Sequence, residues 1–314
     1  MSIMLEEKTL TLSREGKVKL YIAKPHNLLE AKAVIFINHG MAEHIKRYED
    51  FAVKLALNNF IVYGHNHRGH KDSISGKDEY GYVSTGDTFQ TFITDVGMIV
   101  DMIKKEYPNL PLFLLGHSMG SFVVQRFAQL YGKKINGIIL SGSGKQNTLA
   151  LNFGIAYANL VCKLKGDKHR SKSLHKLVFG PYNKAFKPNR TDLDWLNRDE
   201  KEVDKYIDDP FCGGIFSASF YRDFFRCLKN INQNFELIPK DLPVFIISGS
   251  MDPVGAYGKG INKLFNTLKQ QNIKSIDYKL YNDARHEIFL EINKDEVMND
   301  CIEWLDMNSK LCNI

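Results

Sequence analysis

Short apolar runs recur along the chain, and most of them are continuous rather than alternating in character. From residue 33 onward these runs contain few polar residues, which is typical of strands covered on both faces in a parallel sheet. The first two runs have the pattern of a hairpin and predict an antiparallel edge. The predicted strands are Lys8–Leu12, Val18–Ala23, Ala33–Asn38, Phe60–Tyr63, Pro111–Leu115, Gly137–Ser141, Pro243–Ser248 and Ile276–Tyr281.

Helical periodicity lies between these strands. From Phe89 to Ile103 the apolar residues recur at the i, i+3, i+4 and i+7 positions of an amphipathic helix, with Thr88 as its expected cap and Pro108 beyond its end. Further helices are predicted near residues 122–130, 261–268 and 297–305. Alternating strands and helices predict an open α/β sheet, whose sites lie at the carboxyl ends of its strands.

The alternation stops between residues 143 and 240. No run in this stretch predicts a strand, and aromatic residues are frequent in it. We therefore expect residues 1–142 and 241–314 to form a mostly parallel, eight-stranded sheet flanked by helices. Residues 143–240 are then inserted between the sixth and seventh strands as a helical cap, or lid, over the site.

Composition and charge exclude several classes of protein. With 44% apolar and 25% charged residues, the composition is that of an ordinary globular protein and excludes general disorder, collagen and a coiled coil. The 314 residues are enough for two domains, or for one large α/β domain with an insertion. A net charge of +6 does not predict nucleic-acid binding. The five cysteines are widely separated, which argues against a disulfide framework. The first residues also show no secretory signal pattern, so we expect a cytoplasmic protein.

One basic run stands out within the expected cap. Lysine and arginine residues recur between positions 163 and 176, opposed only by Asp167. The simplest interpretation is a solvated face, in which His169 and His175 are also expected to be exposed. The alternative is a transient contact with a membrane surface that carries anionic lipid.

A G-x-S-x-G pattern, Gly116-His117-Ser118-Met119-Gly120, joins a predicted buried strand to a predicted helix. Strand, sharp turn and helix are the context that a nucleophile elbow requires. The two glycines permit the tight turn, and the serine is exposed at its tip beside a helix N-terminus, which favours developing negative charge. Ser118 is therefore the candidate nucleophile, and the alternative is a plain strand–helix turn.

A serine hydroxyl needs a base, and in sites built on such an elbow the acid and then the histidine follow the serine along the chain. His286 lies in the loop after the last predicted strand and is the candidate base. Asp252 follows the preceding strand and is the candidate acid, which would orient the imidazole. Asp283, in the same loop as His286, is the alternative acid.

A tetrahedral intermediate needs two hydrogen-bond donors. The backbone N–H of Met119, directly after the nucleophile, is expected to supply the first. The loop Asn38-His39-Gly40-Met41 follows a predicted buried strand, and the N–H of Met41 is the expected second donor. The alternative is an ordinary turn that contains a glycine.

Histidines cluster in two loops. They are His39, His44, His65, His67 and His70. No H-E-x-x-H motif is present and no cysteine or carboxylate pattern accompanies them, so we expect packing and hydrogen bonding near the elbow rather than a metal site. No phosphate-binding glycine loop is present either, so nucleotide binding has no support.

Several segments together resemble the monoacylglycerol lipase/lysophospholipase-like branch of the serine α/β-hydrolases, in its bacterial form. They are HGMAEHIKRY (39–48), the RGH of HNHRGHKDS (65–73), LLGHSMGS (114–121), LDWLNRDEKEVDKYIDDPFCG (193–213), SGSMDPVGAYGKG (248–260) and LYNDARHEIFLE (280–291). The resemblance implies the α/β-hydrolase fold, with Ser118 as nucleophile, Asp252 as acid and His286 as base. It also implies oxyanion-hole N–H groups from Met41 and Met119, and hydrolysis of carboxylic esters without a metal or organic cofactor.

Two stretches depart from the family pattern. Ala42 replaces the second glycine of H-G-x-G-E-H, and Asn66 and Lys71 replace the aspartate and the last glycine of D-x-R-G-H-G. None of the three belongs to the triad, so these departures bear on substrate choice rather than on the chemistry.

The sequence thus predicts a serine hydrolase of small-molecule acyl esters, such as a monoacylglycerol, a lysophospholipid or another ester of short to medium acyl length. A peptidase (amidase) or an acyltransferase with the same triad is the alternative, because the acyl-enzyme can also form from an amide or meet an alcohol. A non-catalytic binding protein of this fold would be expected to lack a triad residue, and all three are present.

Overall fold

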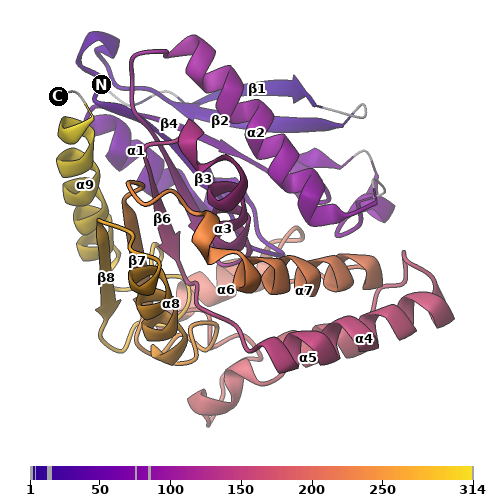
Figure 1. Cartoon of the computed structure of the whole chain (residues 1–314). Helices are drawn as coiled ribbons and strands as arrows, with labels where there is room; N and C mark the ends of the chain where they lie inside the picture. Colours follow the sequence, from indigo (N-terminus) through magenta and orange to yellow (C-terminus); the bar gives the residue numbers. More distant parts are fainter. Residues whose placement is uncertain (1–2, 4, 13–15, 75, 84–85, 313–314) are drawn as a thin grey trace.

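The structure, a computed structural model, describes residues 3, 5–12, 16–74, 76–83 and 86–312. These residues form an eight-stranded sheet in the order β1-β2-β4-β3-β5-β6-β7-β8 (Figure 1). β2 pairs antiparallel with both of its neighbours, whereas every later pair is parallel. The strands are β1 (Leu5–Thr11), β2 (Lys17–Ala23), β3 (Ala33–Asn38), β4 (Phe60–His65), β5 (Leu112–His117), β6 (Gly137–Ser141), β7 (Val244–Gly249) and β8 (Ile276–Tyr281).

All eight strands lie where the apolar runs predict them. β3 to β7 are buried along their whole length, as continuous apolar runs require. Two strands extend two residues further than predicted, to His65 and His117. Both extensions consist of a glycine and a histidine, which do not continue the apolar run. His65 nevertheless pairs with Asn38, and His117 with Ser141, so the strands continue to these residues.

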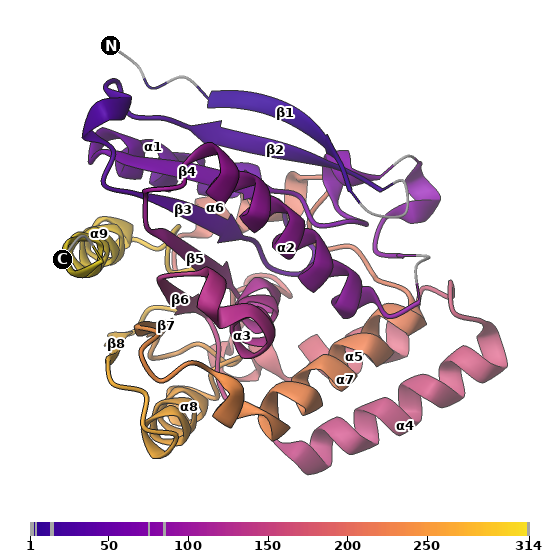
Figure 2. The same cartoon turned by 45° about the horizontal axis from the view of Figure 1, so that its top comes forward.

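Helices cover both faces of the sheet (Figure 2). α1 (Glu49–Leu57) and α9 (Lys294–Leu311) share one hydrophobic cluster with one face. α2 (Thr88–Glu106), α3 (Met119–Tyr131) and α8 (Lys259–Gln270) share another cluster with the opposite face. The sheet is therefore the middle of three layers.

The start of α2 corrects one expectation. Asp87 rather than Thr88 is the capping residue, and its carboxylate accepts hydrogen bonds from the N–H groups of Phe89 and Gln90. Both Asp and Thr favour this position, so the sequence alone does not separate two neighbouring candidates.

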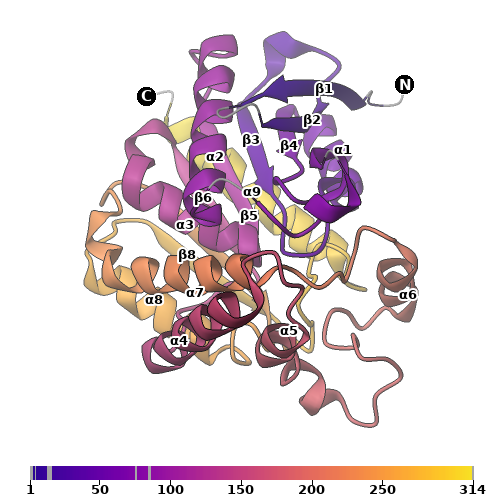
Figure 3. The same cartoon turned by 90° about the vertical axis from the view of Figure 1, so that its right-hand side faces the viewer.

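The segment between β6 and β7 forms helices, as expected. They are α4 (Thr148–Lys165), α5 (Lys172–Phe179), α6 (Glu200–Asp208) and α7 (Ala218–Gln233). α4 and α7 lie side by side, and α6 lies apart from them (Figure 3). In the described part of this segment the only β-pairing is an isolated bridge between Arg170 and Ser217. Nowhere among the described residues is a helix both long and apolar enough to cross a membrane.

Candidate active site

Ser118 lies on a strained turn between β5 and α3, where the G-x-S-x-G pattern predicts it. Its φ of 50° and ψ of −120° lie in a sparsely populated region, at a cost of about 1–3 kcal/mol. A Cβ at Gly116 would lie 2.4 Å from the Gly120 carbonyl oxygen, and a Cβ at Gly120 would lie 2.1 Å from the Asn38 carbonyl oxygen. The two glycines therefore let the helix start pack directly against β5 and the end of β3.

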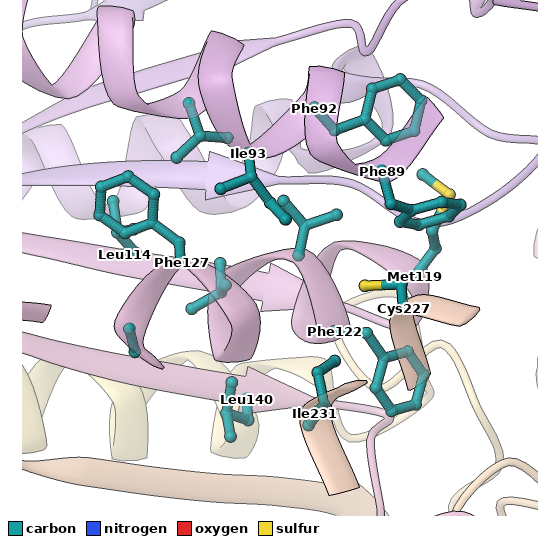
Figure 4. Packing of buried hydrophobic residues seen from close by; sticks show 14 of the residues in the cluster. Phe89, Phe92, Ile93, Leu114, Met119, Phe122, Phe127, Leu140, Cys227 and Ile231 are labelled. Carbon is teal, nitrogen blue, oxygen red and sulfur yellow. The ribbon is translucent and has the colours of Figure 1, made fainter. Parts of the chain in front are cut away.

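The helix behind Ser118 is held by the apolar core (Figure 4). Met119 and Phe122 of α3 belong to one buried cluster with Phe89 of α2, Leu140 of β6 and Cys227 of α7. Because α3 is enclosed by the sheet, α2 and α7, it cannot shift without opening a void in the core. This packing maintains the strained backbone of the turn.

The acid and base candidates come from neighbouring strands. β7 and β8 pair in parallel, so the loops that follow them leave the same edge of the sheet. There Nδ1 of His286 lies 3.0 Å from both carboxylate oxygens of Asp252. This carboxylate also accepts hydrogen bonds of 2.9 Å from the Ser248 hydroxyl and the Val254 N–H, which fix its orientation.

Asp283 does not contact this pair. Its exposed carboxylate accepts a hydrogen bond from the Asn282 side chain, and its N–H donates to the Ser250 hydroxyl. The geometry therefore favours Asp252 as the acid and leaves Asp283 a role in shaping the loop.

The buried Asp252 tunes the imidazole of His286. Burial lowers the pKa of His286, but the charge of Asp252 and its hydrogen bond to the ring outweigh burial and raise that pKa above the ordinary value of 6.5. Donation of Nδ1–H to Asp252 leaves Nε2 as the nitrogen that can accept a proton.

Ser118 and His286 line the same small pocket, together with Trp195. Within the described residues no hydrogen bond joins the Ser118 hydroxyl to His286. Rotation about the Cα–Cβ bond of Ser118 turns the hydroxyl, and hydrogen bonds of this kind often shorten only when substrate binds. The ring of Trp195 packs against that of His286, with centroids 5.1 Å apart, and so restricts the movement of the imidazole.

The two expected oxyanion donors lie beside Ser118. Met41 and Met119 line a pocket with it, and a Cβ at Gly40 would lie 3.1 Å from the Ser118 Cβ. In the part of the chain that is described, neither the Met41 N–H nor the Met119 N–H donates to another backbone group. Two unengaged N–H groups next to a nucleophile suit the stabilisation of an oxyanion.

A buried ionic bridge, which the sequence patterns do not predict, joins the loop after β3 to the loop of His286. Glu43 accepts a hydrogen bond of 2.5 Å from the Gly40 N–H and one of 3.2 Å from Arg47. Arg47 also binds both carboxylate oxygens of Glu287, with Nη2 2.9 Å from Oε2. Arg47 and Glu287 are 240 positions apart, so only the short Glu43–Arg47 spacing carries a local signal.

Two pockets meet at Ser118. The larger has a volume of about 270 Å³ and is lined mainly by apolar residues of α3, α4, α5 and α7. The smaller has a volume of about 60 Å³ and includes His286, Trp195 and His175 in its lining. The expectation that His175 is a solvated residue is therefore wrong: α5 turns it inward, where its Nδ1 lies 3.0 Å from the Tyr221 hydroxyl.

Four of the clustered histidines, His39, His65, His67 and His70, pack against one another below the loop after β3. Burial lowers the pKa of each, to about 4 for His70, so the rings are neutral. The His67 N–H donates a hydrogen bond of 3.0 Å to His39 Nε2. Ring packing involves all four, whereas ring hydrogen bonds within the described residues are made by His39 and His70 and not by His65 or His67.

His44 belongs to a different group. Its Nε2 lies 2.8 Å from Asp209, and Cys212 is close enough for the three side chains to share a metal ion. However, the ammonium of Lys71 lies 3.1 Å from the same nitrogen, so a cation here would meet a like charge. We assign no metal to this group. The sequence does not reveal it because Asp209 lies 165 positions from His44.

This fold, with a serine on an elbow and a histidine–aspartate pair at the same edge of the sheet, defines a serine hydrolase of the α/β-hydrolase class. The chain belongs to the serine aminopeptidase S33 family, whose model matches residues 29–293.

Individual relatives agree with this assignment. The chain is 29% identical over 283 residues to the monoglyceride lipase of Homo sapiens, a match that covers 88% of this chain and 82% of that protein. It is 26% identical over 275 residues to phospholipase YtpA of Bacillus subtilis, covering 87% and 95%. Its structure matches that of a highly thermostable carboxyl esterase from Bacillus coagulans in complex with glycerol, with a TM-score of 0.89, 25% identity, and coverage of 98% and 99%. These findings confirm the family resemblance and the fold that the sequence motifs predict.

Proposed function

We propose that this carboxylic ester hydrolase cleaves monoacylglycerols and related small acyl esters through an acyl-enzyme on Ser118. The observation that carries the proposal is the position of Ser118 where an apolar pocket meets a smaller, partly polar one. A monoacylglycerol likewise consists of an apolar chain and a small polar alcohol joined at the ester. The names of the relatives support the same substrate class.

The reaction follows from the positions of the polar groups. Ser118 Oγ attacks the ester carbonyl carbon while His286 Nε2 takes the hydroxyl proton. The oxyanion then accepts hydrogen bonds donated by the N–H groups of Met41 and Met119. The bond to the alcohol oxygen breaks, and this oxygen takes the proton from His286. Water then attacks the acyl-enzyme with His286 as base, which releases the acid and restores Ser118.

The position of His286 supports an assignment of the two pockets. The leaving alcohol takes its proton from His286, so it must lie on the side of that residue. His286 is among the described residues that line the smaller pocket but not the larger. The acyl chain then occupies the larger pocket, whose volume of about 270 Å³ lies below the roughly 300–1,000 Å³ of typical ligand sites and favours a short to medium acyl group.

The smaller pocket also favours a small alcohol. Its volume of about 60 Å³ is far below the roughly 300–1,000 Å³ of typical ligand sites. A glycerol group can enter such a space more readily than the larger head group of a lysophospholipid. Lysophospholipids are therefore the second candidate substrates.

An amide substrate is the alternative that the family name suggests. An aminopeptidase must pair the ammonium group of its substrate with a carboxylate. Glu43 and Glu287 of the smaller pocket are already bound to Arg47, and no Asp or Glu is among the described residues that line the larger pocket. The lack of an available carboxylate favours an ester over a peptide.

A substrate panel tests this proposal. We expect hydrolysis of 1-butyrylglycerol and 4-nitrophenyl butyrate, slower hydrolysis of lysophosphatidylcholine, and none of alanine 4-nitroanilide. Ser118→Ala should be inactive on every substrate while its thermal unfolding stays close to that of the wild type. Faster cleavage of the anilide than of the esters, or transfer of the acyl group to added glycerol in preference to water, would contradict ester hydrolysis as the function.

We also propose that the cap makes transient contact with an anionic membrane surface. α4 exposes Leu149, Phe153, Leu160 and Leu164 at helical spacing. The lysines of the basic run are exposed at the end of α4 and on α5. Such a face inserts apolar side chains among lipid head groups while lysines attract anionic lipid. Phe153 also lines the larger pocket, so docking would bring the pocket close to the lipid.

Vesicle cosedimentation tests this contact. The wild-type protein should bind vesicles that contain phosphatidylglycerol more strongly than vesicles of phosphatidylcholine alone, and added salt should weaken the binding. Replacing Phe153 and Leu164 by serine should reduce it. Equal binding to both kinds of vesicle would rule out a role for anionic lipid.

A cytoplasmic location fits the cysteines. All five are free, as in proteins of reducing compartments. Cell fractionation should recover the protein with cytoplasmic markers, and recovery outside the cytoplasm would contradict this location.

A further inference from the structure

The cap contributes to the smaller pocket a side chain whose hydrogen-bonding capacity the protein uses only in part. His175 of α5 lines this pocket with Ser118 and His286. Its ring packs against Phe179, with centroids 4.8 Å apart, and its Nδ1 lies 3.0 Å from the Tyr221 hydroxyl. Within the described residues, its Nε2 makes no hydrogen bond.

Tyr221 determines which ring nitrogen of His175 carries the proton. The Tyr221 side chain is completely buried on α7, and the proton of a buried hydroxyl needs an acceptor. Among the described groups, Nδ1 of His175 is the acceptor within reach. Burial lowers the pKa of His175, so the ring is neutral at pH 7 and carries its single proton on Nε2. Nε2 is therefore a hydrogen-bond donor.

Three other polar side chains of the same pocket are engaged within the protein. The carboxylates of Glu43 and Glu287 are bound to Arg47. The Tyr206 hydroxyl donates a hydrogen bond of 2.8 Å to the carbonyl oxygen of Ala42. Within the described residues, the Nε2–H of His175 and the indole N–H of Trp195 make no hydrogen bond, so both remain for a bound molecule, and His175 is the one contributed by α5.

We propose that His175 determines the specificity for the alcohol half of the substrate, because its Nε2–H donates a hydrogen bond to a hydroxyl of that alcohol. The enzyme would then select esters of polyols such as glycerol over esters of simple alcohols. The inference rests on the proposed function, since it requires the alcohol to occupy the pocket that contains His286. An alcohol without a second hydroxyl would leave this N–H without a partner in the bound state.

A matched pair of esters tests the inference. 1-Butyrylglycerol and propyl butyrate carry the same acid and the same carbon chain in the alcohol, and they differ only in hydroxyl groups. In His175→Phe, which keeps an aromatic ring beside Phe179, kcat/KM for the glyceryl ester should fall by about threefold to tenfold, the value of one net hydrogen bond. The value for the propyl ester should fall much less, because that alcohol has no hydroxyl to accept the hydrogen bond.

Two further variants separate recognition from packing. His175→Gln keeps an N–H donor and should retain part of the preference for the glyceryl ester. Tyr221→Phe leaves the imidazole in place but removes the hydroxyl that holds its tautomer, so it should weaken the preference without abolishing it. His169→Phe, in the same segment but not among the described residues lining either pocket, is the control and should behave as the wild type.

The outcomes distinguish this inference from the proposed function. An equal loss on both esters in His175→Phe would indicate a packing role and overturn the inference, as would an undiminished preference for the glyceryl ester. A wild-type enzyme that cleaves propyl butyrate but not 1-butyrylglycerol would contradict the proposed substrate class itself, and the inference would fall with it.

Discussion

Single residues at this site occupy backbone positions that few side chains tolerate. Ser118 has a positive φ, and Gly120 lies where a Cβ would meet the carbonyl oxygen of Asn38. Gly142, at the end of β6, has a φ of 56°, and a Cβ there would lie 2.8 Å from Cε1 of His286. The reactive groups therefore approach one another because small residues leave the space for them.

Gly120→Ala tests this close approach. The added Cβ would meet backbone rather than a flexible side chain, so α3 must move away from β3, and we expect a loss of about 3 kcal/mol in the free energy of unfolding. Urea denaturation measures this loss. Gly97→Ala is the matched control: its Cβ would lie in the middle of α2, 3.7 Å from the nearest atom of Phe127. This control should stabilise the protein by up to about 1 kcal/mol. Equal stability of the two variants would contradict the packing.

Asp252→Asn tests the role of the buried carboxylate. The amide keeps the shape but removes the charge and favours the wrong imidazole tautomer, so kcat should fall by about 10⁴-fold. Urea denaturation should show that the variant remains folded. A fall of less than tenfold would contradict the assignment of Asp252 as the acid.

The pH dependence of the wild type tests the same pair. His286 must be neutral to accept the proton of Ser118, and its pKa is raised above the ordinary value of 6.5. As the pH falls through this raised pKa, His286 becomes protonated and kcat/KM should decline, with a midpoint above pH 6.5. In Asp252→Asn the strongest opposition to burial is removed, while the weaker influence of Glu287 and Glu43 remains, so the midpoint of the residual activity should move to lower pH. A midpoint that is the same in both proteins would show that Asp252 does not tune His286.

Local sequence motifs predict the site residues that directly follow a strand, because the sheet brings the ends of its parallel strands together. They miss residues that reach the site through packing between helices. Ser118, Asp252 and His286 each follow a recognisable strand, and parallel strands deliver their ends to one edge. His175 follows no strand. Its helix lies among lysines that indicate solvent, and its contacts with Phe179 and with Tyr221 of α7 become apparent only in the folded structure.

Among the secondary-structure elements, the loop after β8 and the segment before α6 are bound together. Glu291 is almost completely buried, and its carboxylate accepts hydrogen bonds from the backbone N–H groups of Arg198, Arg285 and Ile292 and from the Arg198 side chain. The N–H of Glu287 donates a hydrogen bond of 2.8 Å to a carbonyl of the same cap segment. The cap thus supports the loop that carries His286.

Glu291→Ala tests this connection. Removing the carboxylate leaves the backbone N–H groups of Arg198 and Arg285 without their acceptor and the Arg198 side chain with Asn293 alone, so we expect a loss of about 1–3 kcal/mol in the free energy of unfolding. Because the His286 loop loses its anchor, kcat should also fall in the protein that remains folded. Glu296→Ala, which removes a half-exposed partner of Lys279, should change stability by less than about 1 kcal/mol. Similar effects of the two substitutions would show that the anchor is unimportant.

The predictability of an element depends on whether its pattern is local. The apolar runs place all eight strands. Burial on both faces demands such runs in β3 to β7, whereas β1 is largely exposed and β8 is only partly buried, and both have weaker patterns. Helix α6 contains no apolar run that would predict it. Its sequence is mostly charged, and Val203 and Tyr206 are its buried residues. Its position depends on contacts such as the one between Tyr206 and Ala42, which are distant in the sequence.

In the molecule as a whole, one edge of the sheet collects residues that are far apart along the chain. The strand order places the ends of β3, β5, β7 and β8 along this edge, so the loops that follow them meet beneath the cap. The order in which the candidates Ser118, Asp252 and His286 follow their strands, and a helical segment between β6 and β7, are predictable from the sequence. The division of the site into two pockets is not, because it arises from side chains of α3, α4, α5 and α7 packing together.

Covalent labelling tests the central claim most directly. The account predicts that a fluorophosphonate adds one adduct to the wild-type protein, seen by intact-mass spectrometry, and that the labelled peptide places it on Ser118. Ser118→Ala should remain unlabelled, and His286→Ala should be labelled far more slowly because its serine has lost the base. An adduct on another residue, or an unlabelled wild-type protein that is correctly folded, would contradict the account.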